Sequence, residues 1–262
     1  MLTFVGIGLY DEKDITLKGL DAISCADRVF AEFYTSKMMG TTIDRMESQY
    51  QTKITVLSRE AIEIDPSWLH HAKCENVVLL TGGDPLISTT HIDLRLRASD
   101  LGIATAVVHS ASIVSAAPGL AGLQNYRFGK SATIPFPYHT RSKTVVSETP
   151  YNVIIQNLAN NLHTMLFLDI DRDRGCMTIP EAVELLMRVD CEREHGTPMH
   201  SALGIGIARA GSPDVLIRCD RLCDLATFDF GAPMHLLIVP ASLHPLEADA
   251  LVRFADAPEW IR

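Results

Sequence analysis

The 262-residue chain lacks any paired-cysteine motif. Its six cysteines are scattered, with no C-x-x-C pair and no even framework of spacings: Cys25, Cys74, Cys176, Cys191, Cys219 and Cys223. Its ten histidines also show no metal-ligand spacing. A disulfide scaffold and a structural zinc site both need such patterns. We therefore expect reduced thiols, a reducing compartment and no bound metal.

The chain also lacks basic blocks, low-complexity segments and apolar runs of membrane-spanning length. Its formal net charge is -9 and its pI about 5.5. The first residues run directly into a predicted strand, without the charged and apolar regions of a signal peptide. An acidic chain of this kind does not suit nucleic acid or an anionic membrane surface. We expect a soluble, cytoplasmic protein with no nucleic-acid and no membrane partner.

What the chain does have is length, and 47% hydrophobic residues to form cores. Two domains are expected, over residues 1–114 and 115–262. The first half alternates strands at 2–7, 28–32, 54–57, 77–80 and 104–108 with helices at 14–20, 67–74 and 89–99. This alternation predicts an α/β fold with a mostly parallel sheet. The second half is more mixed, with strands at 165–170, 203–208, 215–218 and 235–239, and helices near 153–159, 178–192 and from 245.

Residues 81–85 (Thr-Gly-Gly-Asp-Pro) are the most informative segment. They stop the apolar strand 77–80 abruptly. The two glycines allow a backbone to approach a ligand closely, and Pro85 fixes the turn. Asp84 is thereby placed at the carboxyl end of a strand, where open α/β sheets bind their ligands. A carboxylate there favours a cationic or hydroxyl-bearing ligand over a phosphate.

Four other strand exits share this position and consist mainly of small or apolar residues. They are residues 6–9, 109–113, 168–170 and 208–211. Exits from both halves could converge on one ligand site, although small residues at a strand end also simply permit tight turns. His235 differs because it begins an apolar strand, and it is the best functional candidate among the histidines.

A dinucleotide-binding alternative follows from Gly6 and Gly8, with Glu32 near the end of the second strand. The Rossmann fingerprint needs a third small residue where this chain has Asp11. Asp11, Glu12 and Asp14 would also oppose a pyrophosphate. A nucleotide-binding oxidoreductase therefore remains only an alternative.

Nine segments, taken in order, resemble the diphthine synthase family within the wider tetrapyrrole-methylase fold. They are 4–9 (FVGIGL), 14–19 (DITLKG), 32–36 (EFYTS), 83–85 (GDP), 89–91 (TTH), 109–113 (HSASI), 163–164 (HT), 168–170 (LDI) and 242–245 (SLHP). The wider fold normally carries Gly-Pro-Gly-Asp where this chain has Gly-Leu-Tyr-Asp at 8–11, and this difference argues against a tetrapyrrole substrate, which stays the alternative within the fold. The compact length resembles the archaeal members.

This resemblance implies two α/β domains of the tetrapyrrole-methylase type with a cofactor cleft between them. It implies a methyltransferase that uses S-adenosylmethionine, with S-adenosylhomocysteine as product, to trimethylate the amino group of an aminocarboxypropyl-modified histidine of translation elongation factor 2. The product is diphthine, an intermediate of diphthamide. A homodimer is also implied. The cofactor contacts carry over to Leu9, Asp84, Ile87, Ser112, Ile113, Leu168, Ala210 and His235.

The amine must lose a proton before each methyl transfer, because a primary amine is mostly protonated at neutral pH. No spacing identifies the base. Asp169, Glu32, Tyr34 and water all stay open. The segment 135–143 follows a predicted strand and carries Phe136 and Tyr138 together with Arg141 and Lys143. We expect it either to dock the elongation factor or to be an ordinary connecting loop.

Overall fold

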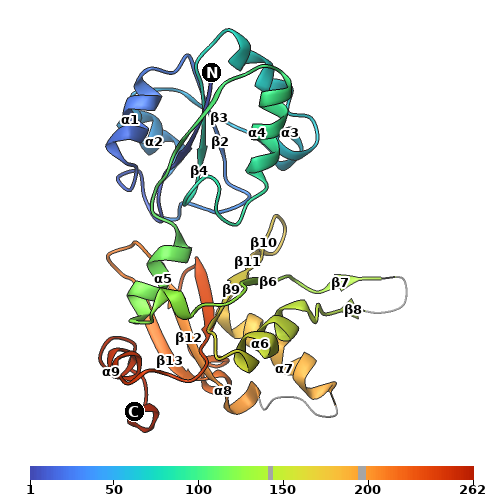
Figure 1. Ribbon diagram of the computed structural model, residues 1–262, viewed down its shortest axis with the longest axis vertical. Coiled ribbons are helices and arrows are strands. Elements are labelled where there is room, and N and C mark those ends of the chain that lie inside the picture. Colours follow the sequence, from blue (N-terminus) through green and yellow to red (C-terminus); the bar gives the residue numbers. More distant parts are fainter. Residues whose placement is uncertain (141–143, 194–198) are drawn as a thin grey trace. The chain divides into compact units, whose positions relative to one another are not determined.

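The chain forms two compact units, Met1–Ile113 and Val114–Arg262. Figure 1 is a ribbon diagram of the computed structural model, which describes residues 1–140, 144–193 and 199–262. Each unit is built around its own five-stranded sheet. Within the described ranges, no helix has both the length and the apolar character needed to cross a bilayer.

Unit 1 (Met1–Ile113) is a parallel sheet with helices on both faces. The strands, β1 to β5, are Leu2–Gly6, Arg28–Glu32, Ile54–Val56, Val77–Thr81 and Thr105–Val108. They lie in the order β3-β2-β4-β1-β5, and every pair is parallel. The helices, α1 to α4, are Leu17–Ser24, Ile43–Tyr50, Arg59–Glu63 and His91–Asp100, with a 3₁₀ helix at Ser67–Lys73. The predicted parallel α/β arrangement is confirmed.

Alternate residues of these strands belong to two separate cores, because successive side chains of a strand point to opposite faces and helices cover both faces of this sheet. Phe4, Phe30 and Leu79 pack with the side that carries α3, the 3₁₀ helix and α4. Val5 and Leu80 belong to the core on the side of α1 and α2. Figure 1 shows the two pairs of helices on opposite sides of the sheet.

Unit 2 (Val114–Arg262) contains a mixed sheet in the order β13-β12-β14-β9-β6. Its strands, β6 to β14, are Ala132–Ile134, Tyr138–His139, Thr144–Val145, Thr164–Leu168, Ile170–Asp171, Gly175–Cys176, Leu203–Ala208, Leu216–Arg221 and His235–Val239. Only β6 and β9 pair in parallel within the main sheet, and β7–β8 and β10–β11 form separate two-stranded ribbons. The helices, α5 to α9, are Ile113–Ala121, Thr149–Ala159, Ile179–Cys191, Leu222–Leu225 and Pro245–Phe254.

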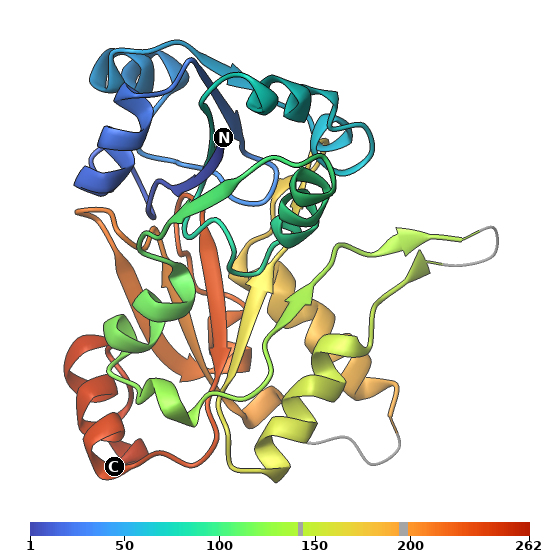
Figure 2. The same cartoon turned by 45° about the horizontal axis from the view of Figure 1, so that its top comes forward.

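The core of unit 2 lies between this sheet and helices α6, α7 and α8. Leu166, Leu237 and Val239 of the strands pack there against side chains such as Ile154 and Leu186. Figure 2 shows α5 and α9 on the other side of the sheet. Helix α7 begins where its sequence predicts, because Thr178 and Glu181 form a capping box around its first turn.

Three predicted elements differ from the structure. The helix expected from residue 14 begins only at Leu17, because Thr16 is its N-cap and accepts from the Gly19 N–H. The helix expected at 67–74 is a 3₁₀ helix. The strand expected at 165–170 is divided at Asp169, whose carboxylate binds the N–H of Ile170 and turns the chain. Helices α2 and α3 were not predicted at all.

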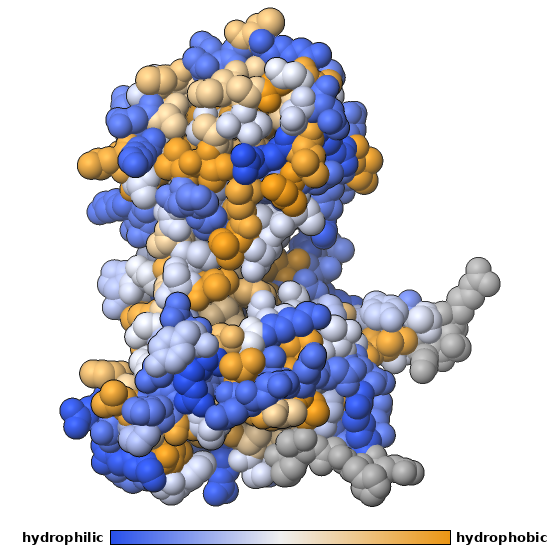
Figure 3. All heavy atoms as spheres, viewed as in Figure 1, coloured by the Kyte–Doolittle hydropathy of each residue, from blue (hydrophilic) through white to orange (hydrophobic). Residues whose placement is uncertain are grey.

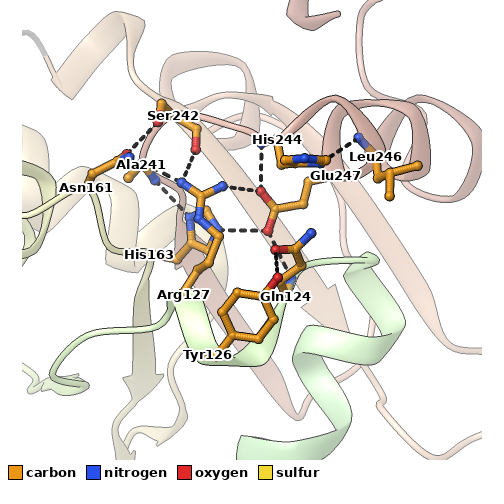
Figure 4. A network of polar contacts seen from close by, with 10 residues as sticks. All are labelled: Gln124, Tyr126, Arg127, Asn161, His163, Ala241, Ser242, His244, Leu246 and Glu247. Carbon is orange, nitrogen blue, oxygen red and sulfur yellow. Dashed lines mark hydrogen bonds and ion pairs between the residues drawn. The ribbon is translucent and has the colours of Figure 1, made fainter.

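A buried ion pair fixes the beginning of α9 (Figure 4). The carboxylate of Glu247 is fully buried and is paired with the guanidinium of Arg127, which also donates to the carbonyl oxygen of Ser242 at 2.6 Å. The Glu247 oxygens accept from the N–H groups of Gln124 and His244, at 2.9 and 2.8 Å. This network ties three segments that are far apart in the sequence.

His163 completes the network. Its Nδ1 accepts from the N–H of Ala241 at 3.0 Å, so its Nε2 carries the proton and donates to Glu247 at 3.2 Å. Burial lowers the pKa of His163. Burial works to raise the pKa of Glu247, but its hydrogen bonds to Gln124, His244 and His163 bring it below its ordinary value. Segments 163–164 and 242–245, two of the family-like segments, thus have a structural role.

Unit 1 leaves several large apolar side chains exposed. On the face shown in Figure 3, apolar patches lie between hydrophilic side chains. Ile92 and Leu96 are one helical turn apart on α4, and their side chains are 54% and 60% exposed. The two side chains form a short apolar stripe on the exposed face of α4.

Replacing Glu247 with alanine should lower the free energy of unfolding of unit 2 by about 3–5 kcal/mol, since it leaves the partly buried Arg127 and the fully buried His163 without the carboxylate that pairs with them. Glu259→Ala is the control, because its ion pair with Arg262 is exposed and such pairs contribute about 0–1 kcal/mol. Denaturant unfolding measures both. Equal losses would contradict this role for the network.

The same network predicts acid sensitivity. The lowered pKa of Glu247 means that its contribution is present above pH 4.5, its ordinary pKa, and is lost as the pH falls through the lowered value. The pKa of His163 is lowered as well, so protonating this buried ring at acid pH also destabilises the folded state. Unfolding measured from pH 7 to pH 3 should therefore show less pH dependence in Glu247→Ala than in the wild type.

Candidate functional site

Three neighbouring strands of unit 1 end at the same edge of the sheet. Strand β1 lies between β4 and β5, with Gly6 beside Thr81 and Val5 beside Val108. Beyond the strands, the N–H of Gly83 donates to the carbonyl oxygen of Gly8 at 2.7 Å. The Gly-Gly-Asp-Pro turn and the Gly8 loop are therefore joined through their backbones.

Asp84 links this turn to the exit of β5. Its side chain is buried, and one oxygen accepts from the N–H of Leu86 at 3.1 Å. The other oxygen lies 2.7 Å from Nδ1 of His109 and 3.4 Å from the N–H of Ser110. A carboxylate has about four acceptor positions, so these three contacts leave Asp84 able to accept one more. His109 was not predicted as its partner, because the pairing depends on the strand order.

The loop after Gly8 is closed by a carboxylate of the chain itself. One oxygen of Asp14 accepts from the N–H groups of Leu9, Tyr10 and Asp11, at 3.0, 2.7 and 3.4 Å. These are the amides that would have to bind a pyrophosphate in a dinucleotide site. The acids of this loop therefore do more than repel phosphate, because Asp14 already occupies the donors.

In unit 2, three strand ends carry the remaining predicted cofactor residues. Strand β14 runs antiparallel to both β9 and β12. His235 is paired with Ala208, and Leu236 with Phe167. Leu168, Ala210 and His235 therefore lie at the same edge of the unit 2 sheet.

The ring of His235 is held on both sides. Its Nδ1 accepts from the N–H of Ile179, the first residue of α7, at 3.3 Å, and its Nε2 donates to the carbonyl oxygen of Ala232 at 3.1 Å. Burial lowers its pKa, which favours the neutral ring that this arrangement requires. In this geometry His235 orients the start of α7.

The structure brings the eight predicted cofactor residues together in two groups, five in unit 1 and three in unit 2. Within unit 1, Ser112 is buried, Ile87 is 44% exposed, and Leu9 and Ile113 are half-buried. The N–H of Ile87 donates to the carbonyl oxygen of Asp84, which closes the turn. Among the described residues, no group of three His, Cys, Asp or Glu side chains is arranged to hold a metal ion.

The candidate bases differ in their surroundings. The Asp169 oxygens accept from the N–H groups of Phe136 and Ile170, both at 2.9 Å, so this carboxylate holds a turn. Glu32 is fully buried, and burial raises its pKa to about 7 against the opposing hydrogen bonds from Thr35 and Tyr34. Burial also raises the pKa of Tyr34 well above its ordinary value.

The proposed docking segment is only partly described. Tyr138 lies in the β7–β8 ribbon with a 56% exposed side chain. Phe136 lines an open pocket of about 480 Å³ with residues that include Arg174, whose guanidinium lies over the Phe136 ring. Arg141 and Lys143 fall outside the described residues.

Comparison with known proteins assigns this chain to one family. The model of the tetrapyrrole (corrin/porphyrin) methylases matches residues 1–209. The chain is 55% identical to diphthine synthase of Methanosarcina mazei over 262 residues, covering 100% of this chain and 98% of the relative.

Solved structures agree. A crystal structure of diphthine synthase matches 99% of this chain and 98% of its own, with a TM-score of 0.90 and 43% identity. That of a putative diphthine synthase from Entamoeba histolytica matches 98% and 99%, with a TM-score of 0.87 and 37% identity. The predicted fold, two α/β domains of the tetrapyrrole-methylase type, is confirmed.

Gly8 should be intolerant of any side chain. It has φ +82°, and an added Cβ would lie 2.2 Å from Cβ of Asp14, which is held by three amides. Gly102 is the control, since it has φ +71° but open space around it. Gly102→Ala should cost about 1–2 kcal/mol for the backbone conformation alone, and Gly8→Ala more. Denaturant unfolding compares them, and equal costs would show that the Gly8 loop relaxes freely.

Proposed function

This chain belongs to the diphthine synthases within the tetrapyrrole methylase family, and we propose that its methyl donor is S-adenosylmethionine. The proposed acceptor is the amino group of the aminocarboxypropyl-modified histidine of translation elongation factor 2. Three transfers would give the trimethylammonium group of diphthine. Because that factor works in the cytoplasm, we place this protein there as well.

The observation that carries the proposal is the Asp84 carboxylate, held where three strand exits of unit 1 meet. S-adenosylmethionine carries ribose hydroxyls and an ammonium group, both of which can donate to a carboxylate, and it has no phosphate. The nearby loop amides are already bound by Asp14, which suits a ligand without phosphate. An oxidoreductase that binds a dinucleotide would need those amides.

The sulfonium of the donor is already a strong electrophile, so no metal is needed to activate it. The task of the protein is to bind and orient the donor and to exclude water from the reacting groups. We assign donor binding to Leu9, Asp84, Ile87, Ser112, Ile113, Leu168, Ala210 and His235. Because both ring nitrogens of His235 are already hydrogen-bonded, we expect this residue to contact the donor through its backbone or the edge of its ring.

We further propose that the protein is a homodimer. The exposed Ile92 and Leu96 on α4 form an apolar stripe that a second copy could cover. Apolar side chains in the centre of an interface are a common source of affinity between identical subunits. Light scattering on the wild type should give twice the chain mass, and a monomer mass at all concentrations would contradict the proposal.

Methyl transfer itself is the direct test. Purified protein is incubated with labelled S-adenosylmethionine and elongation factor 2 that carries the aminocarboxypropyl histidine. We expect three methyl groups per factor, and none on the factor with an unmodified histidine. Absence of transfer to the modified factor, or equal labelling of both factors, would reject the proposed function.

Asp84→Ala should weaken binding of S-adenosylhomocysteine by about 1.5–3 kcal/mol, the usual loss for a hydrogen bond to a charged group. Asp84→Asn keeps the size and one acceptor oxygen, so it should lose less. Calorimetry measures the affinities, and denaturant unfolding shows whether unit 1 remains folded. Wild-type affinity in a folded Asp84→Ala protein would restrict Asp84 to holding the turn.

A further inference from the structure

Unit 1 contains a buried polar cluster beside the proposed donor site. Glu32 and Thr81 are register partners at the carboxyl ends of β2 and β4, so their side chains lie on the same face of the sheet. His91, the first residue of α4, lies on that face as well, near the ring of Phe4. All three polar side chains are completely buried.

The tautomer of His91 follows from its one hydrogen bond. Its Nδ1 lies 3.0 Å from the carbonyl oxygen of Pro85, which can only accept. Nδ1 therefore carries a proton, and in a neutral ring Nε2 has a bare lone pair. That Nε2 has no hydrogen-bond partner among the described residues and lies 3.6 Å from Oε1 of Glu32.

Glu32 has one satisfied oxygen and one without a partner. Its Oε2 accepts from the N–H groups of Tyr34 and Thr35, at 3.2 and 3.1 Å, while Oε1 faces His91 and has no hydrogen-bond partner in the described part of the chain. If Glu32 were ionised and His91 neutral, a buried charge would face a lone pair. One proton between the two groups removes that conflict.

The surrounding charges favour the same state. Burial raises the pKa of Glu32 and lowers that of His91, and the nearby carboxylate of Glu63 works in the raising direction on both groups. Arg59 is paired with Glu63 and lies over the ring of Tyr34. The remaining polar groups of the cluster, the hydroxyls of Tyr34 and Thr81, are neutral near pH 7. Within the cluster, no cation is therefore available to neutralise an ionised Glu32 in place of a proton.

The cluster contacts the Gly82–Pro85 turn at both of its ends. His91 binds the carbonyl oxygen of Pro85, the residue after Asp84. Glu32 binds the loop that follows β2, and Ser36 of that loop packs closely against Gly82. A change in the positions of Glu32 and His91 would therefore act on the Gly82–Pro85 turn through both of these contacts.

We propose that Glu32 and His91 share one proton and together position the Gly82–Pro85 turn, so that Glu32 is a positioning residue for donor binding at Asp84. The inference rests on the proposed function, because it assumes that the turn binds the methyl donor. Above about pH 7 the shared proton is lost, a charge appears at a buried site and the turn loses its support. Affinity for the donor should then fall by up to tenfold for each further pH unit.

The test measures the Kd of S-adenosylhomocysteine by calorimetry from pH 6 to pH 9. The wild type should bind with constant affinity below about pH 7 and progressively more weakly above it. In Glu32→Gln, the side-chain amide donates to His91 at every pH. This variant should bind within a few fold of the wild type at pH 6 and show no loss above pH 7. Glu32→Ala should bind at least tenfold more weakly at all pH values.

Glu75→Gln is the matched control. It changes the carboxylate that pairs with Arg28, at the opposite end of β2, and should retain the wild-type profile. Comparing the wild type with Glu32→Gln cancels any titration of the ligand. The inference is overturned if wild-type affinity does not change with pH, or if Glu32→Gln loses affinity in the same way.

Nitrogen NMR of His91 tests the shared proton without any ligand. At pH 6 the spectrum should show Nδ1 protonated and Nε2 as a hydrogen-bond acceptor or shared-proton site. In Glu32→Ala the Nε2 signal should move to that of a bare nitrogen. A ring protonated at Nε2 alone would overturn the inference. If the NMR result holds but the wild type binds no S-adenosylhomocysteine at any pH, the proposed function fails and the proton-sharing pair stands.

Discussion

The hydrogen-bonded contacts of Asp84 are the constraint on which the candidate site of unit 1 depends. Three parallel strands deliver their loops to one edge of the sheet, but strand pairing ends before the loops begin. The backbone bond between Gly8 and Gly83 joins two of the loops, and the contacts of Asp84 with His109 and Ser110 join the third. The same carboxylate thus organises the loops and remains able to accept from a ligand, so its two roles cannot be separated by simply deleting it.

Much of this site could be predicted from the sequence, because parallel strands must end together. The sequence places the loops after β1, β4 and β5 at one edge of the sheet. The evidence was the strand runs 77–80 and 104–108 and the glycines at 6, 8, 82 and 83. The capping residues of α7 also fixed its start correctly. These features depend on local chemistry and on the alternation of strands and helices, both of which are visible in a single sequence.

The partners of those residues could not be predicted, for two physical reasons. His109 follows β5 and reaches Asp84 because β1 alone separates β5 from β4. Glu32 lies near His91 because β2 pairs with β4, whose turn leads into α4. Strand order is a tertiary property. The helix expected at 14–20 was begun too early, at Asp14, for a local reason. Both Asp14 and Thr16 can cap a helix, and Thr16 takes that position while Asp14 binds the loop amides. Competition between two good capping residues cannot be settled from their identities alone.

The carboxylates of this protein show why a count of acidic residues is a poor guide to its ligand. Glu247 is buried against a guanidinium and keeps its charge, whereas Glu32 is buried against a histidine lone pair and favours a proton. Asp14 binds three amides and thereby removes a phosphate site. Of these four carboxylates, Asp84 is the one that is held in place by the chain and can still accept a further hydrogen bond. The proposed preference for a ligand without phosphate therefore rests on which backbone donors are already occupied, and the net charge of the loop adds to it only secondarily.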